Sequence, residues 1–203
     1  MLSADNKQCV IDSPQCIQAV EFYKRLTQYG IVATQAELEQ MFKEGRLGFV
    51  LTGSWLIAQL RKEAPEINFG VTFVPRPGMD IGENISFAGG EYLVVNKKTA
   101  HPREAIALAK FMAWKNNTIS FCQIAGKFIP SSKLADEDIY YANRAAERTF
   151  FDQLKSSKFS PSHPNWPEMQ DILELSFSEA VTNKKTVRQA LKEAKAKIDR
   201  YLK

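Results

Sequence analysis

Apolar residues recur every three or four positions in the stretch that follows Ser13 and Pro14. Serine is a favoured helix N-cap, and proline suits the first position of a helix. The apolar positions that come next are Ile17, Val20, Tyr23 and Leu26. This spacing predicts an amphipathic helix that closes at Gly30.

The same patterns predict helices along most of the chain. Thr34 and Glu37 form a capping box at the start of a second, shorter helix, which Gly45 ends. Further helical stretches cover residues 56–62, about 102–114, 118–125 and about 137–155. After a Ser/Pro-rich loop over residues 156–164, one helix opens at residues 165–167, and Thr186 with Gln189 caps the last one.

Three short apolar runs, flanked by glycine or proline, predict buried strands over residues 47–51, 68–74 and 92–95. They alternate with helices up to residue 117, beyond which the pattern is purely helical. Strands that alternate with helices pair in parallel. The sequence therefore predicts an α/β fold that is rich in helices.

Composition and charge restrict the function further. The chain has 203 residues with 44% apolar content, enough for one large or two small domains. Its 27 basic and 23 acidic residues are interspersed, so we expect no nucleic-acid partner. The apolar runs are too short for a membrane span, and the first residues lack the layout of a secretory signal. A signal for export would thus lie outside this chain.

No residues form a catalytic, metal or cofactor motif. Cys9, Cys16 and Cys122 are an odd number without zinc spacing, and His101 and His163 stand outside any nucleophile or metal pattern. Cys122 lies in an apolar run, so we expect it to be a packed core thiol. The sequence predicts no cofactor and no metal.

Five segments occur in a characteristic order. They are residues 11–14 (IDSP), residues 41–49 leading to Gly53-Ser54-Trp55, residues 68–71 (NFGV) before a proline-rich turn, Gly89-Gly90 before a strand, and residues 184–191 (KKTVRQAL). This succession resembles the C-terminal half of family 1 extracellular solute-binding proteins of sugar ABC transporters, the group of the maltose-binding proteins. Gly48-Phe49 departs from the small residue and methionine of many members, and we expect the core to accommodate Phe49.

The resemblance implies a periplasmic binding protein-like type II architecture that is incomplete, because family members are about twice as long. By that resemblance, residues 1–86 belong to the C-terminal lobe, residues 87–130 are a crossover segment contributing to the N-terminal lobe, and residues 131–203 return to the C-terminal lobe. A half without its sheet partners would expose apolar surface, so a truncated chain is expected to dimerise or to swap elements between copies to cover that surface.

The function that the resemblance implies is solute binding without catalysis. Such a protein captures a mono- or oligosaccharide outside the cytoplasm, in the periplasm or lipid-anchored at the cell surface. Its lobes close on the ligand, and the membrane permease subunits of an ABC importer recognise the closed form. The partners implied are therefore the sugar and the permease.

Aromatic and glycine residues mark the expected ligand site. Gly53 and Ser54 precede Trp55 at a strand-to-helix turn, where free backbone N–H groups and an open indole face suit a sugar. The alternative is that Trp55 packs in the core. Trp166 would either stack on a ligand or act as a hydrophobic staple for its helix, and we favour the staple.

A second group of expected ligand residues follows in the crossover segment. Gly89 and Gly90 allow close backbone approach, and the Glu91 carboxylate can accept hydrogen bonds from two sugar hydroxyls. The alternative for Glu91 is a solvent-facing side chain at a strand start. Tyr92 alternates to the other face. In the loop after Gly126, Phe128 and Pro130 could rim the cleft.

Two other functions remain open. A carbohydrate hydrolase would need two carboxylates about 5 to 9.5 Å apart across a cleft, and Glu91 is the only acid in a convincing setting. An interaction module that kept the fold but lost the ligand would respond to no solute.

Overall fold

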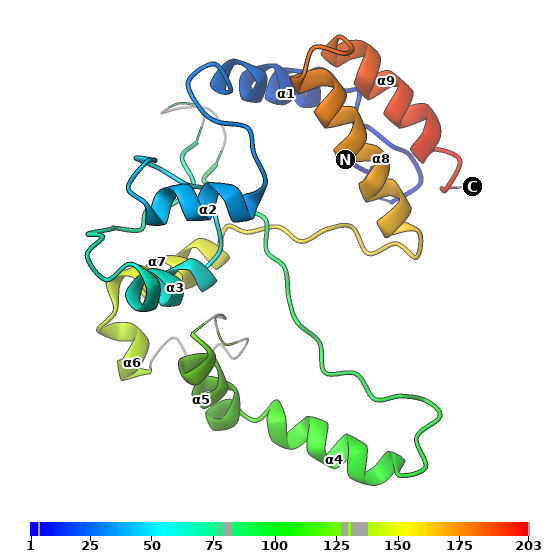
Figure 1. Cartoon of the computed structure of the whole chain (residues 1–203). Helices are drawn as coiled ribbons and strands as arrows, with labels where there is room; N and C mark the ends of the chain where they lie inside the picture. Colours follow the sequence, from blue (N-terminus) through cyan, green and yellow to red (C-terminus); the bar gives the residue numbers. More distant parts are fainter. Residues whose placement is uncertain (4, 77, 79–82, 127–129, 131–137, 203) are drawn as a thin grey trace. The chain divides into compact units, whose positions relative to one another are not determined.

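The computed structural model describes residues 1–3, 5–76, 78, 83–126, 130 and 138–202. The chain divides into two compact units: residues 1–33 with 161–203, here the terminal unit, and residues 34–160, here the central unit. Helices joined by loops and extended segments build both units (Figure 1). Each unit is described by itself.

The terminal unit contains α1 (Pro14–Leu26), α8 (Trp166–Val181) and α9 (Val187–Ile198), and these helices confirm the sequence predictions. Helices α8 and α9 pack against each other, and α1 packs on both (Figure 1). Helix α1 ends a turn before the predicted Gly30. One continuous cluster contains most of the buried apolar residues of this unit: Cys9, Ile11, Met169, Ala180, Val187, Ala190, Leu191 and Ile198.

Hydrogen bonds fix the helix starts and the chain ends of the terminal unit. The Ser13 side chain caps α1, and the Thr186 hydroxyl accepts from the Gln189 N–H, 3.2 Å away, at the start of α9. The Cys9 N–H donates to a carboxylate oxygen of Asp199 at 3.0 Å. The first residues of the chain are thereby tied to its last helix.

The central unit contains α2 (Gln35–Lys43), α3 (Trp55–Glu63), α4 (Pro102–Met112), α5 (Lys115–Ala125), α6 (Ile139–Ala142) and α7 (Ala145–Leu154). The predicted capping box of Thr34 and Glu37 is present at α2. Gly126 ends α5 in the left-handed conformation, as its position after the helix predicts. Small apolar clusters lie around Leu56 and Leu60 and around Ile119 and Tyr141.

The prediction of one long helix over residues 137–155 is wrong, because the stretch forms two helices. Asp138 caps the first of them by accepting from the Tyr140 N–H at 2.9 Å. Asn143 ends it, and Arg144 then takes an extended backbone conformation. This break lets the Arg144 guanidinium lie over the Tyr140 ring, 4.1 Å from its centroid.

The three predicted strands are also wrong for the described residues. Residues 47–51, 68–74 and 92–95 are not helical, but no backbone ladder pairs them. The bridges seen are isolated pairs, Leu2 with Cys9 and Phe87 with Lys158. A strand exists only beside a partner that accepts its hydrogen bonds, and these segments have none in the described part of the chain. Phe49, expected in the core, is 92% exposed for the same reason.

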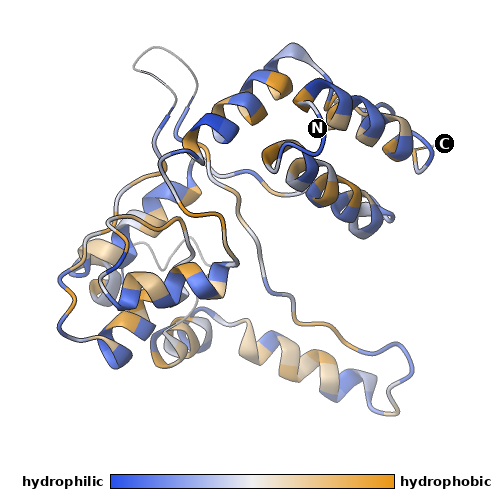
Figure 2. Cartoon of the chain, turned by 45° about the horizontal axis from the view of Figure 1, so that its top comes forward, coloured by the Kyte–Doolittle hydropathy of each residue, from blue (hydrophilic) through white to orange (hydrophobic). Residues whose placement is uncertain are grey.

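The central unit consequently presents much apolar surface. Helix α4 buries no residue, and the extended segment before it exposes Tyr92 and Val94 almost completely. Figure 2 shows the apolar colouring along this helix. Within the described residues, no helix is both long and apolar enough to cross a membrane.

Candidate functional site

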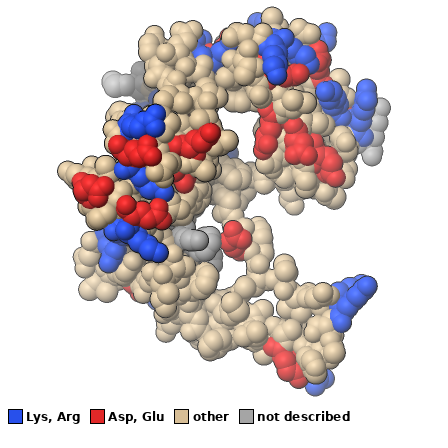
Figure 3. Space-filling model, viewed as in Figure 1, with Lys and Arg blue, Asp and Glu red and all other residues tan. Residues whose placement is uncertain are grey.

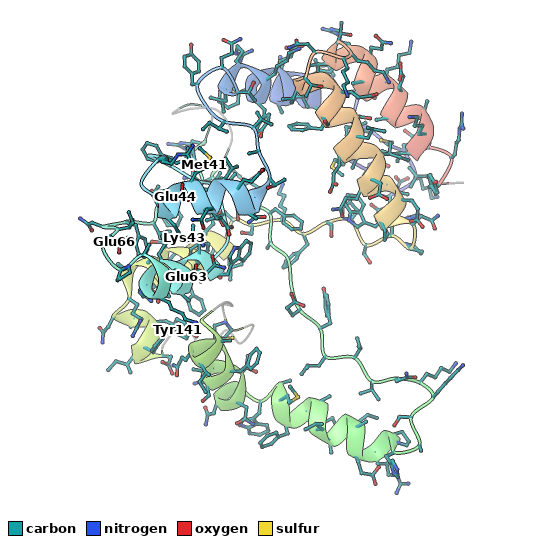
Figure 4. All side chains as sticks on the ribbon, viewed as in Figure 1. Met41, Lys43, Glu44, Glu63, Glu66 and Tyr141 are labelled. Atoms are coloured by element: carbon teal, nitrogen blue, oxygen red, sulfur yellow. The ribbon has the colours of Figure 1, made fainter. Side chains whose placement is uncertain are left out.

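A pocket of about 630 Å³ opens within the central unit. Helix α3 forms one part of its wall, from Ser54 and Trp55 at its start to Glu63 at its end. The end of α5, helix α6 and the start of α7 form the rest, and Tyr141, labelled in Figure 4, contributes from α6. Segments more than eighty residues apart in sequence thus meet around one cavity.

The Trp55 indole lies directly against the Gly53 backbone. A Cβ atom built on Gly53 would sit 1.9 Å from Cζ3 and 2.3 Å from Cη2 of the ring, so no side chain fits there. Glycine is therefore required by the close approach of the ring. Trp55 is half-buried, packing partly on the cluster of Leu56 and Leu60 while it also lines the pocket.

The other end of the indole is held by a buried carboxylate. Trp55 Nε1–H donates to Glu39 Oε1 at 2.9 Å. The same oxygen accepts from the Thr52 hydroxyl at 2.5 Å and from Gln35 Nε2 at 3.0 Å. Glu39 is only 8% exposed and belongs to α2. A charged acceptor forms stronger hydrogen bonds than a neutral one, so this group fixes the ring firmly.

The opposite wall is held by an ion-paired group. Arg61 of α3 donates to both carboxylate oxygens of Glu147 in α7, and Arg144 lies 3.6 Å from one of them. Burial alone would raise the pKa of Glu147, but the hydrogen bonds and charge of Arg61 outweigh it and lower that pKa. The paired carboxylate joins the two helices that flank the pocket.

Tyr141 and Cys122 give the pocket a buried neutral floor. Burial raises the pKa of both groups, so both stay protonated at neutral pH. The Tyr141 hydroxyl has no hydrogen-bond partner among the described residues. Cys122 is buried in α5, which confirms its predicted place in the core, and Cys9 and Cys16 are free as well. Gly126 also lines the pocket. A Cβ atom added to Gly126 would lie 2.7 Å from the Ala58 Cβ.

Charged side chains of α2 and α3 also form paired contacts. Over α2 and α3, acidic and basic groups lie close together on the face drawn in Figure 3. Lys43 Nζ lies 2.9 Å from a carboxylate oxygen of Glu63, which joins α2 to α3 (Figure 4). The hydrogen bond from Lys43 lowers the pKa of Glu63. Both acids that line the pocket, Glu63 and Glu147, are therefore ion-paired.

The structure brings together one of the two predicted groups of ligand residues. Ser54 and Trp55 line the pocket, and Gly53 lies under the ring. The second group lies elsewhere in the central unit, in the extended segment, and none of its members lines the pocket: Gly89, Gly90, Glu91 and Tyr92. All four are exposed.

Of the three remaining predicted residues, the structure describes Trp166 and Pro130, and neither lines this pocket. Trp166 is the first residue of α8 and packs against the core of the terminal unit. Because it lies inside the helix, it supports α8 by packing and is not a staple in the strict sense. Pro130 is buried, whereas Phe128 lies outside the described residues.

Sequence reasoning missed the residues that hold the pocket. Glu39, Arg61 and Glu147 are charged residues at helical positions, where a solvated face is the ordinary expectation. Their contacts join residues 16 and 86 positions apart. A charge directly beside the apolar stripe of α2, as Glu39 is, was the one local signal available.

A comparison with protein families decides the identity of the chain. Residues 1–148 match the model of the bacterial extracellular solute-binding proteins. The chain belongs to this family. A binding protein of Brucella abortus is 27% identical over an alignment 199 positions long, which covers 95% of this chain and 48% of that protein. A galactooligosaccharide-binding protein of Bacillus subtilis is 29% identical over 86% of this chain and 41% of its own length.

Solved structures of solute-binding proteins confirm the fold. The sugar-binding protein MalE of Xanthomonas citri superposes with a TM-score of 0.81 at 22% identity, over 99% of this chain and 52% of its own. An ABC transporter solute-binding protein of Thermotoga lettingae, bound with α-D-tagatose, gives 0.85 at 18% identity, over 100% and 53%. The chain spans about half the length of the relatives it matches. The expected architecture, half of a two-lobed binding protein, is confirmed.

Proposed function

We propose that this chain forms part of an extracytoplasmic solute-binding protein that captures a mono- or oligosaccharide for an ABC importer. The observation that carries the proposal is Trp55, whose indole is held rigidly at the edge of a pocket. A fixed indole face suits the C–H groups of a sugar ring, and polar groups around it suit the hydroxyls.

The names of the relatives support a sugar as ligand. Two proteins of Bacillus subtilis that match this chain are named for binding galactooligosaccharide and maltodextrin. The Thermotoga lettingae protein is bound with a monosaccharide, α-D-tagatose. The partners of the whole protein would be this sugar and the permease subunits of the importer, at the outer side of the membrane.

We further propose that residues 1–86 and 131–203 belong to one lobe and residues 87–130 to the other, so that ligand capture closes the lobes about a hinge. In this proposal Gly89, Gly90, Glu91 and Tyr92 contact the ligand from outside the Trp55 pocket. Their exposure in the described structure is compatible with that role.

The pocket acids favour binding over glycoside hydrolysis. A glycosidase needs a general acid whose pKa is raised, facing a second carboxylate. Hydrogen bonds and ion pairs instead lower the pKa values of both Glu63 and Glu147. Neither group is suited to donate a proton near neutral pH, and we propose that the protein is not an enzyme.

A thermal-shift screen tests the proposal. The 203-residue chain is heated with mono- and oligosaccharides, and with amino acids and peptides as controls. A ligand at 100 times its Kd should stabilise the folded state by about 2.7 kcal/mol. We expect one sugar class to raise Tm, Trp55→Ala to abolish the shift, and Trp114→Ala, at an exposed tryptophan of the same unit, to preserve it. A chain that melts identically with every sugar would contradict the proposal.

A further inference from the structure

We propose that Glu39 is a positioning residue for sugar binding: its buried carboxylate sets the orientation of the Trp55 indole on which the sugar stacks. The inference rests on the proposed function, and it adds a residue of α2 that lies behind the ligand surface.

The indole is held at its two ends by different means. At the five-membered ring, Nε1–H donates to Glu39 Oε1 at 2.9 Å. At the six-membered ring, Cζ3, Cη2 and Cε3 lie where a side chain of residue 53 would begin, so the Gly53 backbone blocks rotation toward that side. Together with the covalent bond from Cβ, these two contacts determine the plane of the rigid bicyclic ring.

The acceptor is itself oriented by its neighbours. Thr52 and Gln35 donate to the same oxygen that accepts from Trp55, and Gln35 also lies 3.4 Å from the Thr52 hydroxyl. Glu39 is nine-tenths buried, and a buried carboxylate is retained only where hydrogen bonds compensate its lost hydration. The three donors supply that compensation. The cluster joins α2, the segment before α3 and the first residue of α3.

Orientation matters because a side chain that must be ordered during binding reduces the affinity. Without Glu39, the indole loses its polar anchor and can leave the stacking orientation. A sugar would then have to order the ring as it binds. Removal of the carboxylate should therefore weaken sugar binding although Glu39 itself touches no ligand.

The first arm of the test needs no sugar. The indole N–H resonance of Trp55 is observed by two-dimensional ¹⁵N–¹H NMR and assigned by its disappearance in Trp55→Phe. Hydrogen bonding to a carboxylate displaces this resonance from that of a solvated indole. We expect Glu39→Ala to move it to the position of an exposed tryptophan, and Glu66→Gln, a charge-matched change at an exposed acid of the same unit (Figure 4), to leave it in place. An unmoved resonance in Glu39→Ala overturns the proposal.

The second arm measures affinity for the sugar found by thermal shift. We expect Glu39→Ala to weaken binding about tenfold or more, the range for a hydrogen bond to a charged group. Glu39→Gln keeps an oxygen acceptor and should retain more of the affinity, which also covers the case in which Glu39→Ala does not fold. In a Trp55→Phe background, which lacks the indole N–H, Glu39→Ala should have little further effect.

The two arms separate the failure of this inference from failure of the proposed function. Equal losses from Glu39→Ala with and without the indole N–H would assign Glu39 a purely structural role and overturn the inference alone. If the chain binds no sugar, this result contradicts both the proposed function and the binding role of Glu39. In that case the indole resonance still decides whether Glu39 holds the ring.

Discussion

The terminal and central units achieve order in different ways. In the terminal unit, α1, α8 and α9 enclose one continuous apolar cluster. In the central unit, the apolar clusters are small, and the walls of the pocket are positioned by partly buried polar contacts, the Glu39 group and the pair of Arg61 with Glu147. Apolar burial is strong but non-directional, whereas hydrogen bonds fix orientation. In the central unit, such hydrogen bonds orient the Trp55 indole at the pocket.

The largest effect should come from the core of the terminal unit. Met169 is completely buried in α8, and Met169→Ala should reduce the free energy of unfolding by about 2–5 kcal/mol through lost burial and a residual cavity. Chemical denaturation followed by circular dichroism measures it. Leu175→Ala, on the same helix but 55% exposed, is the control and should change stability by less than about 0.5 kcal/mol. Similar losses in both variants would contradict the assigned core.

A smaller effect is expected where α5 meets α3. Gly126→Ala forces an alanine into a left-handed conformation and places its Cβ 2.7 Å from the Ala58 Cβ. The conformation alone costs about 1–2 kcal/mol. Gly70→Ala, where nothing lies within 4 Å of the new Cβ, is the control for denaturation experiments. If both substitutions are tolerated equally, α5 does not approach α3 as described.

The ion pair across the pocket should give the central unit an acid sensitivity. Because the pKa of Glu147 lies below its ordinary value of 4.5 in the folded state, its contribution is fully present above that pH and is lost as the pH falls through the folded pKa. Glu147→Gln should therefore flatten the decline of stability below about pH 4.5. The effect is limited, because the Arg61 side chain is 42% exposed and its charge is screened.

Unfolding curves measured at a series of pH values report this change. Glu66→Gln, which removes an exposed carboxylate of the same unit, should leave the slope as in the unsubstituted chain. A slope that Glu147→Gln does not alter would contradict the direction assigned to this pKa.

The smallest effect is expected in the unpaired segment before α4. Val94 is 87% exposed, so Val94→Ser should change the free energy of unfolding of this chain by less than about 0.5 kcal/mol. Denaturation by urea measures it. A loss above 1 kcal/mol would show that the segment is packed in solution.

Most helices could be predicted because their signals are local. Caps such as Ser13, Thr34 and Thr186 and the spacing of apolar residues lie within a few positions of the helix they define. The strands over residues 47–51 and 92–95 could not be judged in this way. A strand depends on a neighbour elsewhere in the fold, and the described residues supply none.

In the candidate site, too, the sequence predicts local features but not contacts between distant residues. Gly53, Ser54 and Trp55 are adjacent in sequence, and the turn they form is a local feature that the structure places at the pocket. Glu39 was missed because its contact with Trp55 spans 16 positions and depends on how α2 packs beside α3. Glu91, the acid that the sequence favoured for a cleft, is exposed, while the buried acid beside the tryptophan is Glu39.

The most direct test of the account is fluorescence from Trp55 alone. With Trp114→Phe and Trp166→Phe, Trp55 is the one remaining tryptophan, and its emission is followed during titration with a sugar that raises Tm. Sugar binding at the Trp55 pocket predicts a saturable change in emission, with a midpoint equal to the Kd from calorimetry. A sugar that stabilises the chain yet leaves Trp55 emission unchanged would contradict binding at this pocket.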